Sequence, residues 1–272
     1  MALDLTVLRL TRGNAGRNVK SATLVIALVC TGLATCFGPL GNAHGEDEAK
    51  TRIAFVGDST ADGLWGGVTG LIPRQACLKE FEFGRFAKNS TGLTRPDKFN
   101  WADEVKRIGE SFTPQLFVMS LGLNDLQSVV ERGKVTLENS PDYPAKYKSR
   151  VTAVLKSATA SGAALLWMGL PAMRDAASDR NAREKNGFFA EAIAELAVPT
   201  VEFVEPWKVG RSGEDKFASF GPDQSGKMIQ IRASDGQHFT PAGELLVASY
   251  LWPKIVAILA KSGAKLAEAC AS

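Results

Sequence analysis

The stretch FVGDST, from Phe55 to Thr60, decides the fold, because it joins an apolar run of strand length to a glycine-rich turn that leads into a helix. The residues at 52–56 have the composition of a buried strand. A serine at such a strand-to-helix turn lies close to backbone N–H groups and to a helix N-terminus, and both stabilise negative charge. Ser59 is therefore presented to a ligand, or else Asp58 or Ser59 only caps the helix.

The composition is that of an ordinary globular protein, with 45% hydrophobic and 22% charged residues in a chain of 272. The first 43 residues hold four basic side chains and one acidic side chain, against 32 and 29 in the whole chain, so the remainder holds 28 of each. Binding to nucleic acid needs an excess of basic side chains. We therefore expect no nucleic-acid partner.

Residues 1–43 are typical of an export signal. A basic region ends at Lys20, an apolar stretch follows over residues 22–40, and the small residues at 41–43 suit a signal peptidase. We expect the protein to be exported, to the periplasm or out of the cell. The apolar stretch is also close to the shortest length that spans a membrane, so an uncleaved N-terminal anchor is the alternative. Only that alternative gives the protein a membrane partner.

Behind this leader we expect a short charged linker at 44–50 and one domain over 51–272. Cleavage of the leader leaves two cysteines in the chain, Cys77 and Cys270. In an oxidising compartment they either form a disulfide that ties the C-terminal tail to the domain or remain two thiols. So few cysteines and histidines argue against a structural zinc site.

Apolar runs of strand length alternate with helical segments throughout the domain. This alternation predicts right-handed βαβ units and an α/β domain with a mostly parallel five-stranded sheet covered on both faces. The segment at 126–144 is predicted to be an irregular excursion. The segment at 206–232 is predicted to be a loop or a small hairpin. Strands are expected at 52–57, 81–86, 116–121, 164–169 and 200–204, and helices after residue 60 and at 101–110, 144–160, 178–197 and 240–260.

The predicted topology places the site before any motif is considered. Ligands of parallel α/β sheets bind at the carboxyl ends of the strands. Ser59 follows the first strand, Gly92 the second and Asn124 the third. We therefore expect these three residues at one edge of the sheet, where two backbone N–H groups and a side-chain amide can stabilise a developing oxyanion. Taken singly, Gly92 is otherwise a turn glycine and Asn124 an ordinary loop residue.

A serine hydroxyl is a weak nucleophile until a base takes its proton, and histidine is the usual base near neutral pH. His238 is the only histidine in the predicted domain, because the other one, His44, lies in the linker before it. Asp235, three residues earlier, is placed to turn back and hold the imidazole in the tautomer that a Ser-His-Asp arrangement needs. A lone histidine is otherwise a surface or capping residue. His238 taken by itself does not exclude this alternative.

Taken together, four segments resemble the SGNH (GDSL) hydrolase family: GDS at 57–59, Gly92, GLND at 122–125 and DGQH at 235–238. Their order and contexts match the family over nearly all of residues 51–260, and the last two segments are the more specific. The segments at 89–97 and 167–174 look like an exported bacterial subgroup of largely unassigned substrate. Thr60 departs from the family's name motif, which has leucine at this position.

This resemblance implies a flavodoxin-like three-layer α/β/α sandwich and ester hydrolysis without a metal or another cofactor. Carried over by position, Ser59 is the nucleophile, His238 is the general base and then acid, and Asp235 orients His238. The oxyanion hole is then formed by the N–H groups of Ser59 and Gly92 and the side chain of Asn124.

Four further charged residues lie next to these positions. Asp58 and Asp125 are expected to brace loops rather than to react. Arg95 and Arg174 fall on strand-end loops and are candidate substrate-binding residues for an anionic group, with a solvated or structural role as the alternative.

Several functions remain compatible with these residues. The first is an exported serine esterase that removes acyl groups, such as acetyl, from a small molecule or from a cell-envelope or extracellular carbohydrate. The second is an O-acyltransferase that passes the same acyl group to a sugar hydroxyl. The third is a non-catalytic carbohydrate-binding protein of the same fold, and the least favoured is metal-dependent hydrolysis through the aspartates and His238.

Overall fold

The computed structural model describes residues 50–205, 216–266 and 270, so the predicted leader at 1–43 lies outside the described residues. In the described part a five-stranded sheet has the order β2-β1-β3-β6-β7, and all neighbouring strands are parallel. This is the flavodoxin-like strand order. The chain adds β2 on one side of β1 and then adds β3, β6 and β7 on the other side. The strands are β1 (Thr51–Gly57), β2 (Phe81–Ala87), β3 (Leu116–Ser120), β6 (Ala164–Met168) and β7 (Val201–Val204).

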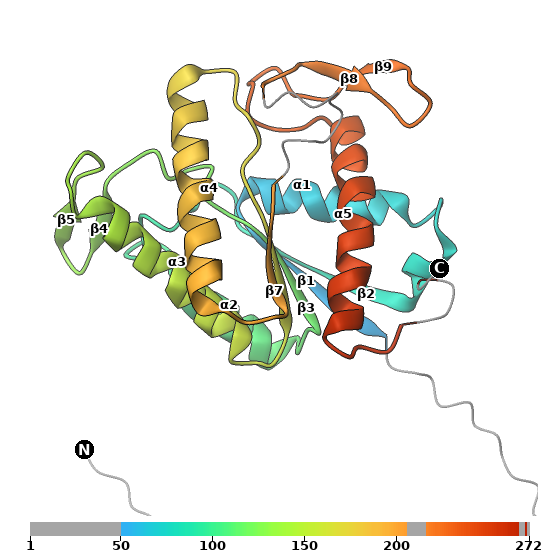
Figure 1. Ribbon diagram of the computed structural model, residues 1–272, viewed down its shortest axis with the longest axis horizontal. Helices are drawn as coiled ribbons and strands as arrows, with labels where there is room; N and C mark the ends of the chain where they lie inside the picture. Colours follow the sequence, from blue (N-terminus) through green and yellow to red (C-terminus); the bar gives the residue numbers. More distant parts are fainter. Residues whose placement is uncertain (1–49, 206–215, 267–269, 271–272) are drawn as a thin grey trace, which may run out of the picture. The chain divides into compact units, whose positions relative to one another are not determined.

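Helices cover both faces of this sheet, which confirms the predicted three-layer sandwich (Figure 1). The first and last helices lie on one face, and the other three lie on the opposite face. A short 3-10 helix (Ala76–Glu80) precedes β2. The helices are α1 (Ser59–Leu71), α2 (Trp101–Ser111), α3 (Tyr143–Thr159), α4 (Ala176–Leu196) and α5 (Pro241–Lys261).

The central strands are buried on both faces, which explains their continuous apolar sequences. Successive side chains of a strand point to opposite faces. In β1, accordingly, Ala54 and Val56 join the core beneath α2, α3 and α4, while Ile53 and Phe55 join the core beneath α1 and α5. This burial fixes the register of the strand that carries the Ser59 turn.

Helix α5 begins as its sequence predicts and is long and apolar enough to cross a membrane by length and composition. Thr240 caps it by accepting a hydrogen bond from the Gly243 N–H, and Pro241 follows in the first turn. Its buried residues, including Leu251 and Ile255, pack in the core shared with α1 and β1. Its apolar character therefore has an explanation in the packing of this domain.

Two hairpins lie outside the main sheet. β4 (Val129–Glu131) and β5 (Lys134–Thr136) pair in the segment that we expected to be irregular, and that prediction was wrong. Arg132 and Gly133 join them and both have positive φ, which suits a two-residue hairpin turn. The second hairpin, β8 (Phe220–Pro222) and β9 (Met228–Gln230), agrees with the alternative of a small hairpin. Residues 206–215 of that predicted segment lie outside the described residues.

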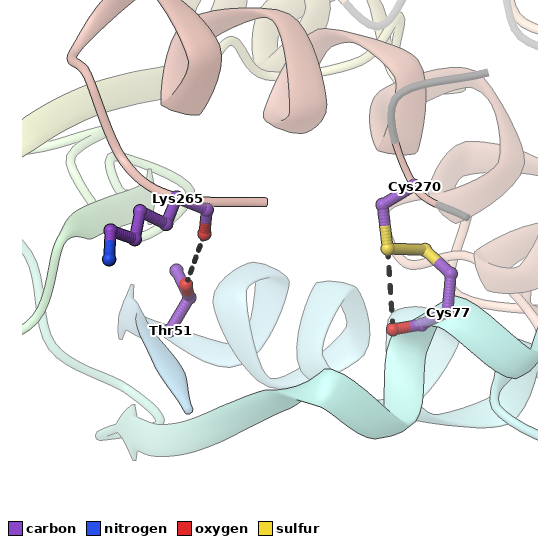
Figure 2. Close-up of a disulfide and its surroundings, with 4 residues drawn as sticks. All are labelled: Thr51, Cys77, Lys265 and Cys270. Atoms are coloured by element: carbon purple, nitrogen blue, oxygen red, sulfur yellow. Dashed lines mark hydrogen bonds between the residues drawn. A yellow bond between two sulfur atoms is a disulfide. The ribbon is translucent and has the colours of Figure 1, made fainter. Parts of the chain in front are cut away.

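A disulfide joins Cys77 to Cys270, so the two cysteines form a pair rather than remaining thiols. Their Cα atoms are 5.4 Å apart, which is within the usual range for a disulfide. Close to it, the Thr51 hydroxyl donates a hydrogen bond of 3.3 Å to the Lys265 carbonyl (Figure 2). The C-terminal segment is thus attached near the start of β1 and the 3-10 helix that precedes β2.

Candidate active site

Ser59 lies at the sharp turn between β1 and α1. Gly57 ends the strand with φ of +148°, and a Cβ atom at this position would lie 1.8 Å from the Ser120 carbonyl oxygen of β3. Only glycine allows this close approach. Asp58 then caps α1 by accepting the Thr60 N–H at 2.9 Å. The capping alternative for Asp58 is therefore correct, and Ser59 remains available as the first residue of the helix.

Ser59, His238 and Asp235 form a continuous hydrogen-bonded chain. The Ser59 Oγ atom lies 2.7 Å from His238 Nε2, and His238 Nδ1 lies 2.6 Å from Asp235 Oδ2. A carboxylate on Nδ1 keeps the proton on that nitrogen and leaves Nε2 as the acceptor for the serine proton. The residues thus have the geometry that activates a serine hydroxyl.

The Asp235 carboxylate is held in its ionised form. Partial burial raises its pKa, but hydrogen bonds from the Gln237 N–H, the His238 ring and the His238 N–H outweigh burial and lower the pKa to about 2. The two backbone bonds are 2.8 and 3.0 Å long. The same carboxylate therefore closes the loop and orients the imidazole.

Two arginines hold the loop that carries His238. Arg232 is buried and donates to the carbonyl oxygens of Gln237 and Ala172, both at 2.7 Å. The Arg174 side chain donates to the Ser234 carbonyl at 2.8 Å, so its guanidinium supports the same loop. The sequence analysis missed Arg232, because a single arginine after a short strand carries no spacing signal.

Arg95, the other candidate substrate-binding residue, has a partner on its own loop. Its guanidinium binds the Asp97 carboxylate through two hydrogen bonds of 2.8 and 2.7 Å. Arg95 and Arg174 thus both support loops through these contacts. This agrees with the structural role that was the alternative to binding an anionic substrate group.

Asp58 connects the Ser59 turn to the loop after β3. Its carboxyl is completely buried, and its Oδ2 atom accepts the N–H groups of Gly122 and Leu123, both at 3.1 Å. Burial raises its pKa to about 6, although hydrogen bonds from Thr60 act in the opposite direction. Asp58 braces these two loops against each other.

Asn124 and Asp125 attach the loop after β2 to the same edge. Asn124 Nδ2 donates to the Thr91 carbonyl at 2.9 Å, next to Gly92. The buried Asp125 carboxylate accepts the N–H groups of Leu93 and Thr94, so it also braces a loop. Loops from three strand ends therefore meet here, as the topology predicts.

These contacts leave donors available for an oxyanion. No acceptor for the N–H groups of Ser59 and Gly92 is found among residues 50–205, 216–266 and 270. The Asn124 amide uses one hydrogen for Thr91 and retains a second. Each of the three predicted donors thus has a hydrogen that the described contacts do not use, and their role as an oxyanion hole stays a prediction.

A small cavity of about 30 Å³ lies beside Ser59 and His238. Its wall also includes Glu244, whose carboxyl packs so closely on α1 that a Cβ atom at Gly63 would lie 2.6 Å from it. Burial and the nearby Asp62 raise the pKa of Glu244 to about 7, while His238 acts to lower it. Sequence reasoning missed Glu244, because a glutamate in a first helical turn is unremarkable. The remaining wall is largely apolar, including Leu64, Met168, Pro171, Phe239 and Val247.

Solved structures with this fold include several esterases. A carbohydrate esterase family 3 structure from Talaromyces cellulolyticus has a TM-score of 0.53 at 13% identity, covering 78% of this chain and 99% of that chain. The psychrotrophic esterase EstA from Pseudoalteromonas sp. has a TM-score of 0.51 at 14% identity, covering 78% and 100%. A GDSL-like lipase from Bacteroides thetaiotaomicron has a TM-score of 0.50 at 15% identity, covering 75% and 87%. A comparison with curated proteins gives no match.

These similarities establish the SGNH hydrolase fold, which the sequence motifs predicted. A family model described as "Protein of unknown function (DUF459)" matches residues 52–254, which is most of the chain. The protein therefore belongs to this family.

Proposed function

We propose that the protein is an exported serine esterase that removes short acyl groups, above all acetyl, from a carbohydrate of the cell envelope or the extracellular space. One observation carries the chemical part of the proposal. Ser59 Oγ, the His238 ring and the Asp235 carboxylate are joined by contacts of 2.7 and 2.6 Å at the carboxyl ends of the strands. This chain of contacts is the arrangement that acyl transfer through a serine requires.

In the proposed reaction the Ser59 oxygen attacks the ester carbonyl while its proton moves to His238 Nε2. The carbonyl oxygen becomes negative and is bound by the N–H groups of Ser59 and Gly92 and by the Asn124 amide. The leaving alcohol then takes the proton from His238, which leaves the acyl group on Ser59. Water, deprotonated by the same imidazole, releases the acid and restores the serine.

The size of the cavity at Ser59 supports a short acyl group. Its volume is only about 30 Å³, which suits a short acyl group better than a long chain. A carbohydrate substrate is supported more indirectly, since the similar structures include one described as a carbohydrate esterase. The Cys77–Cys270 disulfide supports export, because disulfides persist mainly in oxidising compartments.

The test is hydrolysis of 4-nitrophenyl acetate by the purified protein and by Ser59→Ala and His238→Ala. Each variant is expected to lose at least ~10³-fold in kcat, which is the scale of removing a triad residue. Matched controls are Ser149→Ala, at an exposed position of α3, and His44→Gln, and both should keep the wild-type rate. Activity that survives in Ser59→Ala would refute the proposed nucleophile.

The same assay examines the acyl group and its acceptor. Rates should fall from the acetate to the butyrate and octanoate esters, because the cavity at Ser59 is small. Adding a free monosaccharide separates hydrolysis from transfer. Acetate is the expected product in both conditions, and an acetylated sugar as the main product would identify an acyltransferase instead.

A further inference from the structure

A second cavity, of about 150 Å³, lies next to the candidate oxyanion hole. Asn124 forms part of its wall, and Gln237 lines both this cavity and the small one at Ser59. The two cavities are therefore neighbours on either side of the residue that precedes His238. Ser59 lines the small cavity and Asn124 lines the larger one, so an ester that reacts at Ser59 has a neighbouring space for each of its two portions.

The described wall residues of the larger cavity are uncharged and include both apolar and polar side chains. Apolar side chains from Leu123, Leu170 and Met173 form part of its wall, and the polar groups are amides and one hydroxyl. No charged side chain lines it among the residues that the structure describes. Apolar walls with a few convergent polar groups are typical of small-molecule sites. This composition suits a neutral ligand and gives no counter-charge to a phosphate, carboxylate or ammonium group.

Asn181, on α4, is the most informative residue of this wall. It is 8% exposed, and its Oδ1 atom is buried without a hydrogen-bond partner. Asn186, five residues later on the same helix, is also buried, but its Oδ1 accepts the Leu170 N–H at 2.8 Å and its Nδ2 donates to the Leu170 carbonyl at 2.9 Å. Buried amides are normally satisfied, as Asn186 is. The Oδ1 atom of Asn181 therefore retains an acceptor capacity that no group among the described residues uses.

We propose that the larger cavity is the subsite for the alcohol portion of the ester, and that Asn181 binds a hydroxyl group of a neutral, monosaccharide-sized polyol there. The cavity at Ser59 is the smaller of the two and suits the acetyl methyl group, so we assign the larger portion of the ester to the other space. The volume of about 150 Å³ matches that of an engineered protein cavity that binds benzene, so the space suits one compact ring rather than a long chain. This inference rests on the proposed esterase function and specifies its substrate.

The decisive comparison uses two acetate esters with different alcohols. One is a monoacetylated methyl xyloside, whose alcohol carries further hydroxyl groups, and the other is 4-nitrophenyl acetate, whose alcohol carries none. Asn181→Leu is expected to lower kcat/KM for the xyloside ester about 10-fold, because a hydrogen bond to the substrate is lost. For 4-nitrophenyl acetate the change should stay below about 2-fold, because this ester makes no such bond.

Two controls separate recognition from structure. Asn139→Leu, at an exposed position of the chain, should leave both esters unchanged. Thermal unfolding of Asn181→Leu should show a Tm equal to or above that of the wild type, because the unsatisfied amide is removed. Equal losses for both esters, or no loss for either ester, would overturn the assignment of Asn181.

A binding measurement keeps the subsite testable if the esterase proposal fails. Methyl xyloside without the acetyl group is added to Ser59→Ala and to Ser59→Ala/Asn181→Leu, and saturation-transfer NMR detects the bound sugar. The first protein should show a signal and the second should show a signal reduced about 10-fold. An equal signal from both proteins, or none from the first, would reject the subsite, whereas absent hydrolysis by the wild type would reject only the esterase function.

Discussion

Thr60 shows how a single residue adapts the Ser59 turn. The GDSL motif has leucine at this position. Here the Thr60 hydroxyl donates to Asp58 Oδ1 at 2.6 Å and lies 2.7 Å from Ser120 Oγ. Its backbone N–H donates to the same carboxylate oxygen. The substitution therefore adds polar contacts that link α1 to the end of β3 and leaves the Ser59–His238 contact in place.

At the same scale, Glu244 makes the stability of the protein depend on pH. Burial and the neighbouring Asp62 raise its pKa to about 7, so the folded state binds the proton more tightly than the unfolded state. The protonated Glu244 carboxyl therefore contributes fully to the stability of the folded state below the ordinary pKa of glutamate, near 4.5. This contribution is lost as the pH rises through 7. Glu244→Gln should therefore have a higher Tm than the wild type at pH 8, and the difference should shrink toward pH 4.

Scanning calorimetry across this range measures the difference directly. Glu82→Gln, at an exposed position of β2, is the matched control and should leave a Tm difference from the wild type that does not change with pH. The pKa of Asp58 is raised to about 6 for a similar reason, but it contributes equally to the wild type and to both variants. A Tm difference for Glu244→Gln that is constant with pH would contradict the assigned titration.

Among the elements, the loop after β2 depends on one close contact. A Cβ atom at Gly92 would lie 2.1 Å from Asp125 Oδ1, the atom that accepts the Thr94 N–H at 3.1 Å. Gly92→Ala should push this loop away from the carboxylate and move the Gly92 N–H out of the oxyanion hole. We expect kcat for 4-nitrophenyl acetate to fall about 10²–10³-fold, the range for loss of one oxyanion donor.

Gly187→Ala provides the control for this substitution. Gly187 lies in the middle of α4, and a Cβ atom placed there would meet nothing within 4 Å apart from its chain neighbours and the backbone of its own helix. Alanine in a helix interior is more stable than glycine by about 0.5–1 kcal/mol, so this variant should gain Tm and keep its full activity. Wild-type kcat in Gly92→Ala would show that the loop tolerates displacement and would remove Gly92 from the site.

The sequence predicted the elements whose residue patterns follow directly from burial and from their place in the sheet. The strands of the main sheet are apolar because they are buried on both faces, and the rule for strand ends places Ser59, Gly92 and Asn124 together. The β4–β5 hairpin was missed because its three-residue strands are too short for an alternating pattern. Arg232 and Asn181 were missed for another reason, since their environments depend on segments that are distant in the sequence.

For the whole molecule, the disulfide and the candidate site lie at opposite ends of β1. Cys77 and Cys270 are separated by 193 positions. The nearby Thr51 begins the strand, whereas Ser59 lies just beyond its other end, after Gly57 and Asp58. Closing so long a loop restricts the unfolded chain, so removing the disulfide should lower the free energy of unfolding by about 2–5 kcal/mol. Because the loops around Ser59 are held by their own hydrogen bonds, kcat/KM at 25 °C should not change.

The double variant Cys77→Ser/Cys270→Ser measures both quantities through urea unfolding and hydrolysis of 4-nitrophenyl acetate. Reducing agent provides the matched control, because it should destabilise the wild type to the level of the variant and leave the variant unaffected. An unchanged free energy of unfolding would mean that the unfolded chain is not restricted by the disulfide. A fall in kcat/KM at 25 °C, where both proteins remain folded, would instead show that the strand transmits changes from one end of the sheet to the other, and the two ends could no longer be treated as independent.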